Sequence, residues 1–237
     1  HDRMWDETTK TLLRRYRDGQ AEIDGYAEDY ACLVFGLLEL FQADPDPRWL
    51  SWAIALQRRQ DALFWDEDEA GWFSTTGLDP TVLLRMKEDY DGAEPAPSSV
   101  SVMNLLWLAH LVDPGSADRG TWTVAIERTL RLFGSRLEQM GRAVPMMAAA
   151  LSAYLAGPQQ IVIAGDEAGE LERVVAARYL PFALILSIAP GGQEALAAEL
   201  PLMASMRPAG GGAAAYICRD FTCRPPITSA DDLEKAL

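Results

Sequence analysis

Two neighbouring acids open a long apolar stretch that predicts a helix, and Tyr30 follows them directly. Sugar hydrolysis and sugar epimerisation both use positioned carboxylates as general acid or base. We therefore take Glu28 and Asp29 as candidate catalytic residues and Tyr30 as a candidate substrate contact. A structural interpretation stays open, because the helix dipole alone favours acids in a first helical turn.

A second group of charged side chains precedes a later helix start, at Arg85, Lys87, Glu88, Asp89, Asp91 and Glu94. Lys87 is the only lysine between Lys10 and Lys235, so it is not part of a lysine-rich surface. Alternation places Arg85 and Lys87 on one side of an extended segment. A surface salt-bridge cluster is the alternative, since such clusters are common and weak.

The segment from 77 to 98 is the longest non-helical stretch that we predict in the helical part, and long loops in compact domains are usually functional or disordered. We predict that Arg85, Lys87 and Asp91 line a concave pocket, with Asp29 or Tyr30 in reach of the same ligand. Asp91 is then a third candidate catalytic carboxylate, and Arg85, Lys87 and Glu94 are candidate substrate contacts.

Aromatic residues form a third candidate site at Trp65, Trp72, Phe73 and Tyr90. Sugar rings stack on aromatic faces because their C–H surfaces are apolar. We take Trp65 as a substrate-binding candidate. Tryptophan is also an ordinary core residue, so packing is the competing interpretation.

Other reactive side chains give weaker signals. His110 has no spaced partner, so we expect a structural role and no metal, and we expect Asn104 to be a satisfied buried amide. Cys218 and Cys223 have four intervening residues, whereas redox dithiols usually have two, so we favour a structural thiol pair. Gly165-Asp166 lacks a following G-x-G-x-x-G pattern. We expect no cofactor.

Helical periodicity dominates the first two thirds of the chain. We expect helices over 4–18, 25–43, 48–63, about 98–112, 119–137 and 143–156. The acidic run from Asp66 to Gly71 lies between aromatic residues and predicts a short β-hairpin over 64–76. Short links between long apolar helices imply antiparallel helical hairpins.

The pattern changes at Gly157-Pro158, and all seven tryptophans lie at or before Trp122. Apolar strands are expected over 161–164, 183–189 and 216–218, with helices over about 167–179 and 193–206. Strand–helix–strand alternation implies a small parallel sheet. We therefore divide the chain into helical hairpins over 1–156 and a small α/β subdomain over 157–237.

Bulk composition excludes several classes of protein. The 237 residues are 49% hydrophobic and 24% charged, which is typical of a globular protein. The net charge of −14 argues against nucleic acid and anionic membranes as partners. No segment approaches a membrane span, and no signal peptide is expected at the His1 start. Three cysteines make no disulfide framework, so a reducing cytoplasm is the expected location.

Several short segments together resemble a known family, although none is specific alone. They are Asp29-Tyr30-Ala31, Phe64-Trp65-Asp66, Gly71-Trp72-Phe73, Arg85-Met86-Lys87, Asp91-Gly92-Ala93, Tyr179-Leu180-Pro181, and Cys218 with Phe221 to Pro226. In this order they resemble the thioredoxin-domain-containing proteins called spermatogenesis-associated in animals. The resemblance covers most of the chain.

That resemblance implies a mainly α fold: part of an (α/α) helical-hairpin toroid, similar to the six-hairpin glycosidases and the N-acylglucosamine 2-epimerases, followed by a small α/β subdomain. It implies a sugar hydrolase or epimerase that acts through carboxylates on a small carbohydrate. The alternative is a non-catalytic scaffold that binds a ligand or partner for an attached amino-terminal thioredoxin-like region.

One departure from the family pattern bears on these alternatives. The family usually has Pro-Ser-Gly-Asn-Ser where this chain has Pro95-Ala96-Pro97-Ser98-Ser99. Losing the glycine stiffens the loop, and losing the asparagine removes an amide that both donates and accepts hydrogen bonds. The departure favours the scaffold, whereas the retained Arg85, Lys87 and Asp91 favour a site.

Overall fold

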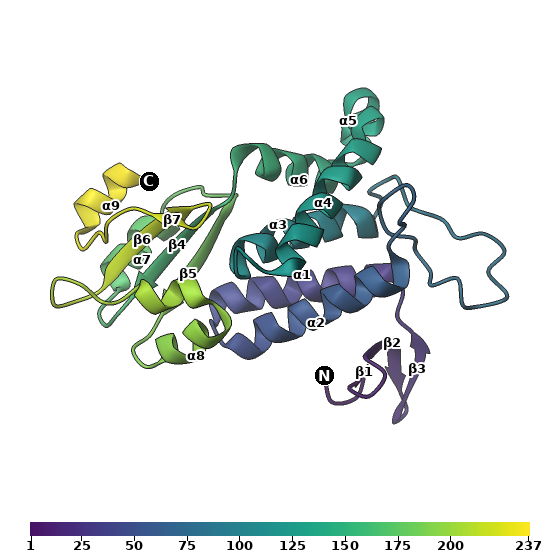
Figure 1. The fold of residues 1–237 in the computed structure, drawn as a ribbon, viewed down its shortest axis with the longest axis horizontal. Helices are drawn as coiled ribbons and strands as arrows, with labels where there is room; N and C mark the ends of the chain where they lie inside the picture. The colour runs from purple at the N-terminus through teal and green to yellow at the C-terminus, as the bar shows by residue number, and fades with distance from the viewer. The chain divides into compact units, whose positions relative to one another are not determined.

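The computed structural model describes residues 1–237 (Figure 1). These residues divide into two compact units, each drawn from separated parts of the sequence. The first unit contains His1–Leu37, Trp52–Leu105 and Trp122–Leu151. The second contains Leu38–Ser51, Leu106–Thr121 and Ser152–Leu237. About half of the residues are helical, so the mainly α character with a small sheet region is confirmed.

Six α-helices and one short 3-10 helix follow each other between residues 27 and 156. They are α1 (Ala27–Ala43), α2 (Pro47–Phe64), α3 (Pro97–Leu111), α4 (Ala117–Leu132), α5 (Gly134–Met140), η1 (Gly141–Ala143) and α6 (Pro145–Ala156). Five of the six helices predicted before residue 157 are present. The one predicted over 119–137 is divided between α4 and α5 at Phe133.

The first two helices run antiparallel, as the three-residue link between them predicts. The Gln60 side chain, near the end of α2, donates to the Ala27 carbonyl at the start of α1 over 3.0 Å. It also donates to the Ser101 hydroxyl of α3 over 2.9 Å. These buried bonds join α1, α2 and α3, and the buried rings of Tyr30 in α1 and Phe64 in α2 also lie together, with centroids 5.7 Å apart.

The helix predicted over 4–18 is wrong. This segment forms an antiparallel sheet of β1 (Trp5–Asp6), β2 (Thr11–Arg17) and β3 (Gln20–Asp24). Asp18 and Gly19 connect β2 to β3 with positive φ angles of 52° and 86°. A two-residue Asp-Gly loop is a strong hairpin signal, because the primed turns need positive φ at both positions.

The hairpin predicted over 64–76 is present in reduced form. Trp65 and Trp72 form one isolated antiparallel bridge, and the acidic residues between them form the turn. The extended segment expected around Arg85 and Lys87 forms no strand and is irregular.

The carboxy-terminal part of the second unit is an α/β arrangement, as predicted. Its elements are β4 (Gln159–Ala164), α7 (Gly169–Ala176), β5 (Ala183–Ile188), α8 (Gly192–Glu199), η2 (Pro201–Ser205), β6 (Ala214–Arg219), β7 (Thr222–Cys223) and α9 (Ala230–Ala236). Ile161 and Ile163 of β4 pack with Leu171 of α7 and Leu233 of α9, so these helices cover one face of the sheet.

The expected parallel sheet is mixed instead. Its strand order is β5-β4-β6-β7, with β4 parallel to β5 and antiparallel to β6. The segment after α8 returns to the carboxyl end of β4, where Ala164 pairs with Ala214. β6 therefore starts where β4 ends and must run in the opposite direction.

Cys218 and Cys223 form a disulfide. The pairing of β6 with β7 places them directly opposite each other, with a Cα–Cα distance of 4.0 Å. The predicted structural pair is therefore covalently bonded, where we expected free thiols. Four intervening residues suit a tight antiparallel hairpin, which brings the two cysteines opposite each other.

Candidate functional site

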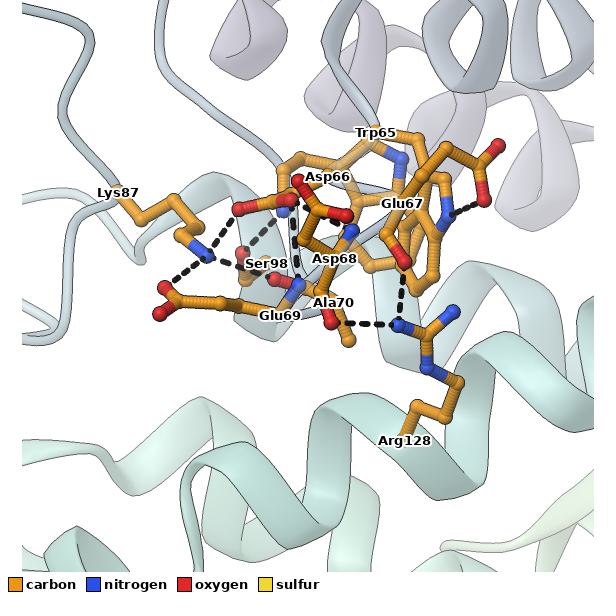
Figure 2. Close-up of polar contacts among 10 residues, drawn as sticks. Trp65, Asp66, Glu67, Asp68, Glu69, Ala70, Lys87, Ser98 and Arg128 are labelled. Atoms are coloured by element: carbon orange, nitrogen blue, oxygen red, sulfur yellow. Dashed lines mark hydrogen bonds and ion pairs between the residues drawn. The ribbon is translucent and has the colours of Figure 1, made fainter.

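The acidic turn after α2 is organised by the side chain of Asp66 (Figure 2). One carboxylate oxygen accepts hydrogen bonds from the backbone amides of Asp68 (2.9 Å) and Glu69 (3.2 Å). The turn closes at Ala70 and Gly71, which both have positive φ. Because Asp66 holds the turn from inside, the turn residues and not Asp66 face solvent.

Lys87 joins the distant loop to this turn. Its ammonium group lies 2.7 Å from the second carboxylate oxygen of Asp66 and 3.0 Å from the carbonyl of Ala70 (Figure 2). Glu69 lies at 3.4 Å. Burial alone would raise the pKa of Asp66, but Lys87 and the turn amides outweigh it and lower that pKa. Asp66 is therefore ionised at neutral pH.

Arg85 and Lys87 do lie on the same side of their segment, as alternation predicts. The Arg85 guanidinium lies 4.1 Å from the centre of the Phe73 ring, and the Lys87 ammonium lies 5.1 Å from it. Arg85 also donates to the carbonyls of Thr75 (3.0 Å) and Leu63 (3.3 Å). These contacts hold the loop against the end of α2.

Asp91 is buried and accepts only backbone hydrogen bonds. One oxygen accepts from the Ala96 amide over 2.8 Å, and the other accepts from Met146 (2.8 Å) and Met147 (3.4 Å) in the first turn of α6. Asp91 therefore fixes the loop on one side and caps α6 on the other. Glu94, three residues later, is exposed and has no ion pair.

Glu28 and Asp29 are held by one cation, Arg14 of β2. The guanidinium lies 2.6 Å from Glu28 and 3.3 Å from Asp29. Asp29 also accepts from the Tyr26 amide over 2.8 Å. Burial raises the pKa of Asp29, against the opposing effects of that amide and of Arg14.

Tyr30 is fully buried, and its hydroxyl accepts the Leu12 amide of β2 over 2.8 Å. Burial raises the pKa of this hydroxyl. Tyr30 therefore connects α1 to the amino-terminal sheet, a contact that supports the fold.

Trp65 packs at the edge of the Trp72 ring, with centroids 4.9 Å apart, and its indole donates to Glu67 over 3.2 Å. Arg128 of α4 lies over the Trp65 ring and donates to the Glu67 and Asp68 carbonyls over 2.7 Å and 3.1 Å (Figure 2). The Trp65 face is thus occupied by a cation.

A cavity of about 340 Å³ opens beside Lys87. Leu132, Phe133 and Met140 supply apolar surface, and the other lining residues are Glu69, Lys87, Asp89, Ser135, Arg136 and Gln139. Arg136 forms an ion pair with Asp89, as Lys87 does with Glu69. The rim therefore carries two cations and two anions.

Of the eight candidate residues, only Lys87 lines this cavity. Arg85 and Asp91 lie elsewhere, so the cavity is not the shared pocket predicted for the three residues. Glu28 and Asp29 are brought together by Arg14. The chemical roles assigned to all eight residues stay predictions.

Sequence reasoning missed the contribution of α4 and α5 to the cavity. Arg136 and Gln139 are separated by three positions on one short helix, which places them on one face. That spacing could have identified them. It also missed Asp61, whose carboxylate accepts the indole N–H groups of Trp72 (2.9 Å) and Trp122 (3.0 Å).

The remaining polar candidates have structural contacts. A ring nitrogen of His110 lies 2.7 Å from the Leu106 carbonyl. The buried Asn104 amide donates to the Ala31 carbonyl over 2.8 Å, while its oxygen has no partner, so Asn104 is only half satisfied. Ser98, within the altered loop, accepts the Trp72 amide over 3.1 Å.

The structure contains no group of three or more histidine, cysteine or acidic side chains placed to hold a metal ion. None of its helices combines the length and apolarity that crossing a bilayer requires.

The chain belongs to the family to which the sequence motifs pointed, that of spermatogenesis-associated protein 20. The chain is 37% identical over 218 residues to spermatogenesis-associated protein 20 of Homo sapiens and of Rattus norvegicus, which covers 90% of this chain. It is 31% identical over 219 residues to an uncharacterised protein of Caenorhabditis elegans. No protein-family model matches the chain.

The chain spans only 27% of the length of the two mammalian relatives and 29% of the nematode relative. The thioredoxin-like region and the helical toroid that the resemblance implies therefore enter only as proposals.

Proposed function

We propose that this chain is a non-catalytic ligand-binding domain, part of a helical toroid, and that the cavity beside Lys87 binds a small neutral molecule with one apolar face. A small carbohydrate fits this description. In this proposal the chain serves an attached thioredoxin-like region as a binding scaffold.

The observation that carries the proposal is that the carboxylate oxygens of Asp91 and Asp66 are already occupied by contacts within the fold. Both oxygens of Asp91 accept backbone N–H groups, and Asp66 is shared between its turn and Lys87. A general acid or base must bring a carboxyl oxygen within hydrogen-bond reach of substrate. Neither of these side chains has an oxygen left for that role without breaking a contact that supports the fold.

The charge and size of the cavity support a neutral ligand. Lys87 and Arg136 are each paired with an acid on the rim, so the lining has no net charge to attract an anion or a cation. The volume of about 340 Å³ lies at the lower end of the range for small-molecule sites. Phe133 offers an apolar contact for C–H groups, and Ser135 and Gln139 offer hydrogen bonds.

A sugar hydrolase or epimerase remains the second candidate, and one observation favours it. Burial raises the pKa of Asp29, and a carboxyl that holds its proton longer is suited to general acid catalysis. Glu28 is the neighbouring carboxylate, and Arg14 contacts both.

The test is a thermal-shift screen of neutral monosaccharides and disaccharides on the whole chain, followed by calorimetry. A ligand that binds only the folded state raises the melting temperature. We expect a saturable rise that is lost in Gln139→Trp, which fills the cavity, and kept in Glu199→Gln on α8. Binding by no neutral compound would contradict the proposal.

An assay of turnover distinguishes the non-catalytic scaffold from the sugar hydrolase or epimerase. The bound sugar is incubated with the protein and analysed by chromatography. We expect recovery of the unchanged sugar. Hydrolysis or epimerisation that Asp29→Asn abolishes would establish the enzyme and overturn the scaffold.

A further inference from the structure

A second cavity, of about 310 Å³, lies on the first unit away from Lys87. One wall is the end of β3 and its link to α1, with Ile23, Asp24 and Tyr26. The other wall belongs to the loop after Phe73, with Leu78, Asp79 and Val82. We call this the 23–82 groove.

One backbone hydrogen bond joins the chain beside the first wall to the chain beside the second, and further hydrogen bonds hold each wall in place. The Ala27 amide donates to the Ser74 carbonyl over 3.1 Å, and the Gly25 amide donates to the Leu12 carbonyl over 2.7 Å. Arg85 holds the carbonyl of Thr75, a lining residue, over 3.0 Å. The groove is therefore formed before any partner binds.

Apolar side chains of the groove face solvent. Ile23 is 50% exposed and Leu78 is 81% exposed. Ile23 also has a φ of 66°, which is rare for a β-branched residue, and that backbone presents its side chain at the rim. Three further apolar residues of the same loop are exposed, namely Leu83, Leu84 and Met86. Exposed apolar side chains at a groove favour an interaction site.

The only charged side chains of the lining are acidic. The Asp24 side chain is exposed and forms no ion pair or hydrogen bond, while its backbone pairs with β2. Asp79 accepts hydrogen bonds from the Thr81 hydroxyl (2.6 Å) and amide (2.8 Å), which lower its pKa and keep it ionised. Apolar surface between two carboxylates is complementary to an apolar group that carries a cation beside it.

We propose that the 23–82 groove docks a partner polypeptide segment in which an apolar side chain lies beside a lysine or arginine. The apolar side chain enters between Ile23 and Leu78, and the cation lies against Asp24 and Asp79. This interaction is separate from the cavity beside Lys87 and does not depend on its ligand.

The charge of the 23–82 groove argues against three other occupants: a second copy of this chain, an anionic membrane and a neutral apolar compound. A second copy of this chain carries a net charge of −14, so like charges oppose self-association. An anionic membrane is repelled by the same carboxylates. A neutral apolar compound gains nothing from Asp24 and Asp79.

The test uses fluorescein-labelled peptides of alternating lysine and leucine, eight residues long, and fluorescence anisotropy at low salt. We expect saturable binding of the lysine–leucine peptide. Peptides with glutamate in place of lysine, or serine in place of leucine, are expected to bind at least tenfold more weakly. No saturable binding of the lysine–leucine peptide would overturn the proposal.

Variants locate the binding. Asp24→Asn leaves every contact in the fold intact, and we expect it to weaken binding about threefold, as for one exposed ion pair. Leu78→Ser is expected to weaken it further. Leu155→Ser on α6 removes an equally exposed leucine and serves as the control. Equal losses in Leu78→Ser and Leu155→Ser, or a dimer by sedimentation that occupies the groove, would contradict the assignment.

Discussion

The Lys87 side chain makes several contacts that support the fold, with Asp66 and with the carbonyl of Ala70 among them. The sequence identified it as unusual because no other lysine lies near it, but gave no indication that Asp66, 21 positions earlier, is its partner. Such a long-range ion pair depends on the turn that orients Asp66 and on the path of the loop, and neither is encoded by a local pattern. Residue types were therefore predictable here, whereas their contacts were not.

The pair of Lys87 and Asp66 predicts a dependence of stability on pH. The folded-state pKa of Asp66 is below its ordinary value of 3.8, so its contribution to stability is present above that value. The contribution is lost as the pH falls through the lower folded-state pKa. We expect Lys87→Met to lower the free energy of unfolding by about 3 kcal/mol at neutral pH, because it leaves a buried carboxylate unpaired.

The measurement is urea unfolding of both proteins between pH 7 and pH 2.5. The difference between wild type and Lys87→Met should shrink below the ordinary carboxyl pKa as Asp66 takes up a proton. Lys10→Met removes an exposed pair with Glu7 and should cost less than about 1 kcal/mol at every pH. A difference that stays constant with pH would exclude Asp66 as the responsible group.

At the scale of elements, the helices were predictable because their apolar periodicity extends over three or more turns. The amino-terminal sheet was not, since Leu12, Leu13 and Tyr16 fit a helical stripe as well as a strand. The Asp18-Gly19 turn was the signal that could have decided between them. The carboxy-terminal strands were found, but their directions depend on the route of the connecting segment.

Asp91 connects two elements, and its loss should destabilise both. Asp91→Ala leaves the Ala96 amide and the first turn of α6 without an acceptor. We expect the free energy of unfolding to fall by about 2 kcal/mol, from losing a helix cap and a buried hydrogen bond. Urea unfolding monitored by circular dichroism measures it.

Glu94→Ala is the matched control, because Glu94 is an exposed acid on the same loop. The Glu94→Ala substitution should change the free energy of unfolding by no more than about 0.5 kcal/mol. If the two variants proved equally stable, Asp91 would not be holding the loop against α6, and its carboxylate would be free for chemistry.

For the whole molecule, composition and the order of elements gave the mainly α class and the α/β tail. They could not give the two compact units, because each unit is assembled from three separated segments. Nor could they give the disulfide, which follows from the pairing of β7 with β6 and not from the cysteine count.

The disulfide leads to a prediction about global stability. It closes a ring of six residues, and loop-closure entropy for a ring of that size contributes about 2 kcal/mol. Within the ring, Asp220 and Phe221 adopt positive φ angles of 45° and 60°, which non-glycine residues rarely adopt. Reduction therefore both restores chain entropy to the unfolded state and lets this turn relax.

We expect reduction by dithiothreitol to lower the free energy of unfolding by about 2 kcal/mol, measured by urea unfolding of the oxidised and reduced chain. The loss should not be larger, because the backbone hydrogen bonds from Arg224 to Ile217 and between Ala215 and Ile227, which lie outside the ring, remain. Cys32→Ser should show the same loss, since Cys32 is not in the disulfide. The double variant Cys218→Ser/Cys223→Ser should be insensitive to the reductant. If wild type were equally insensitive while mass spectrometry after alkylation showed both thiols free, the hairpin would be held by its backbone ladder and side-chain packing alone.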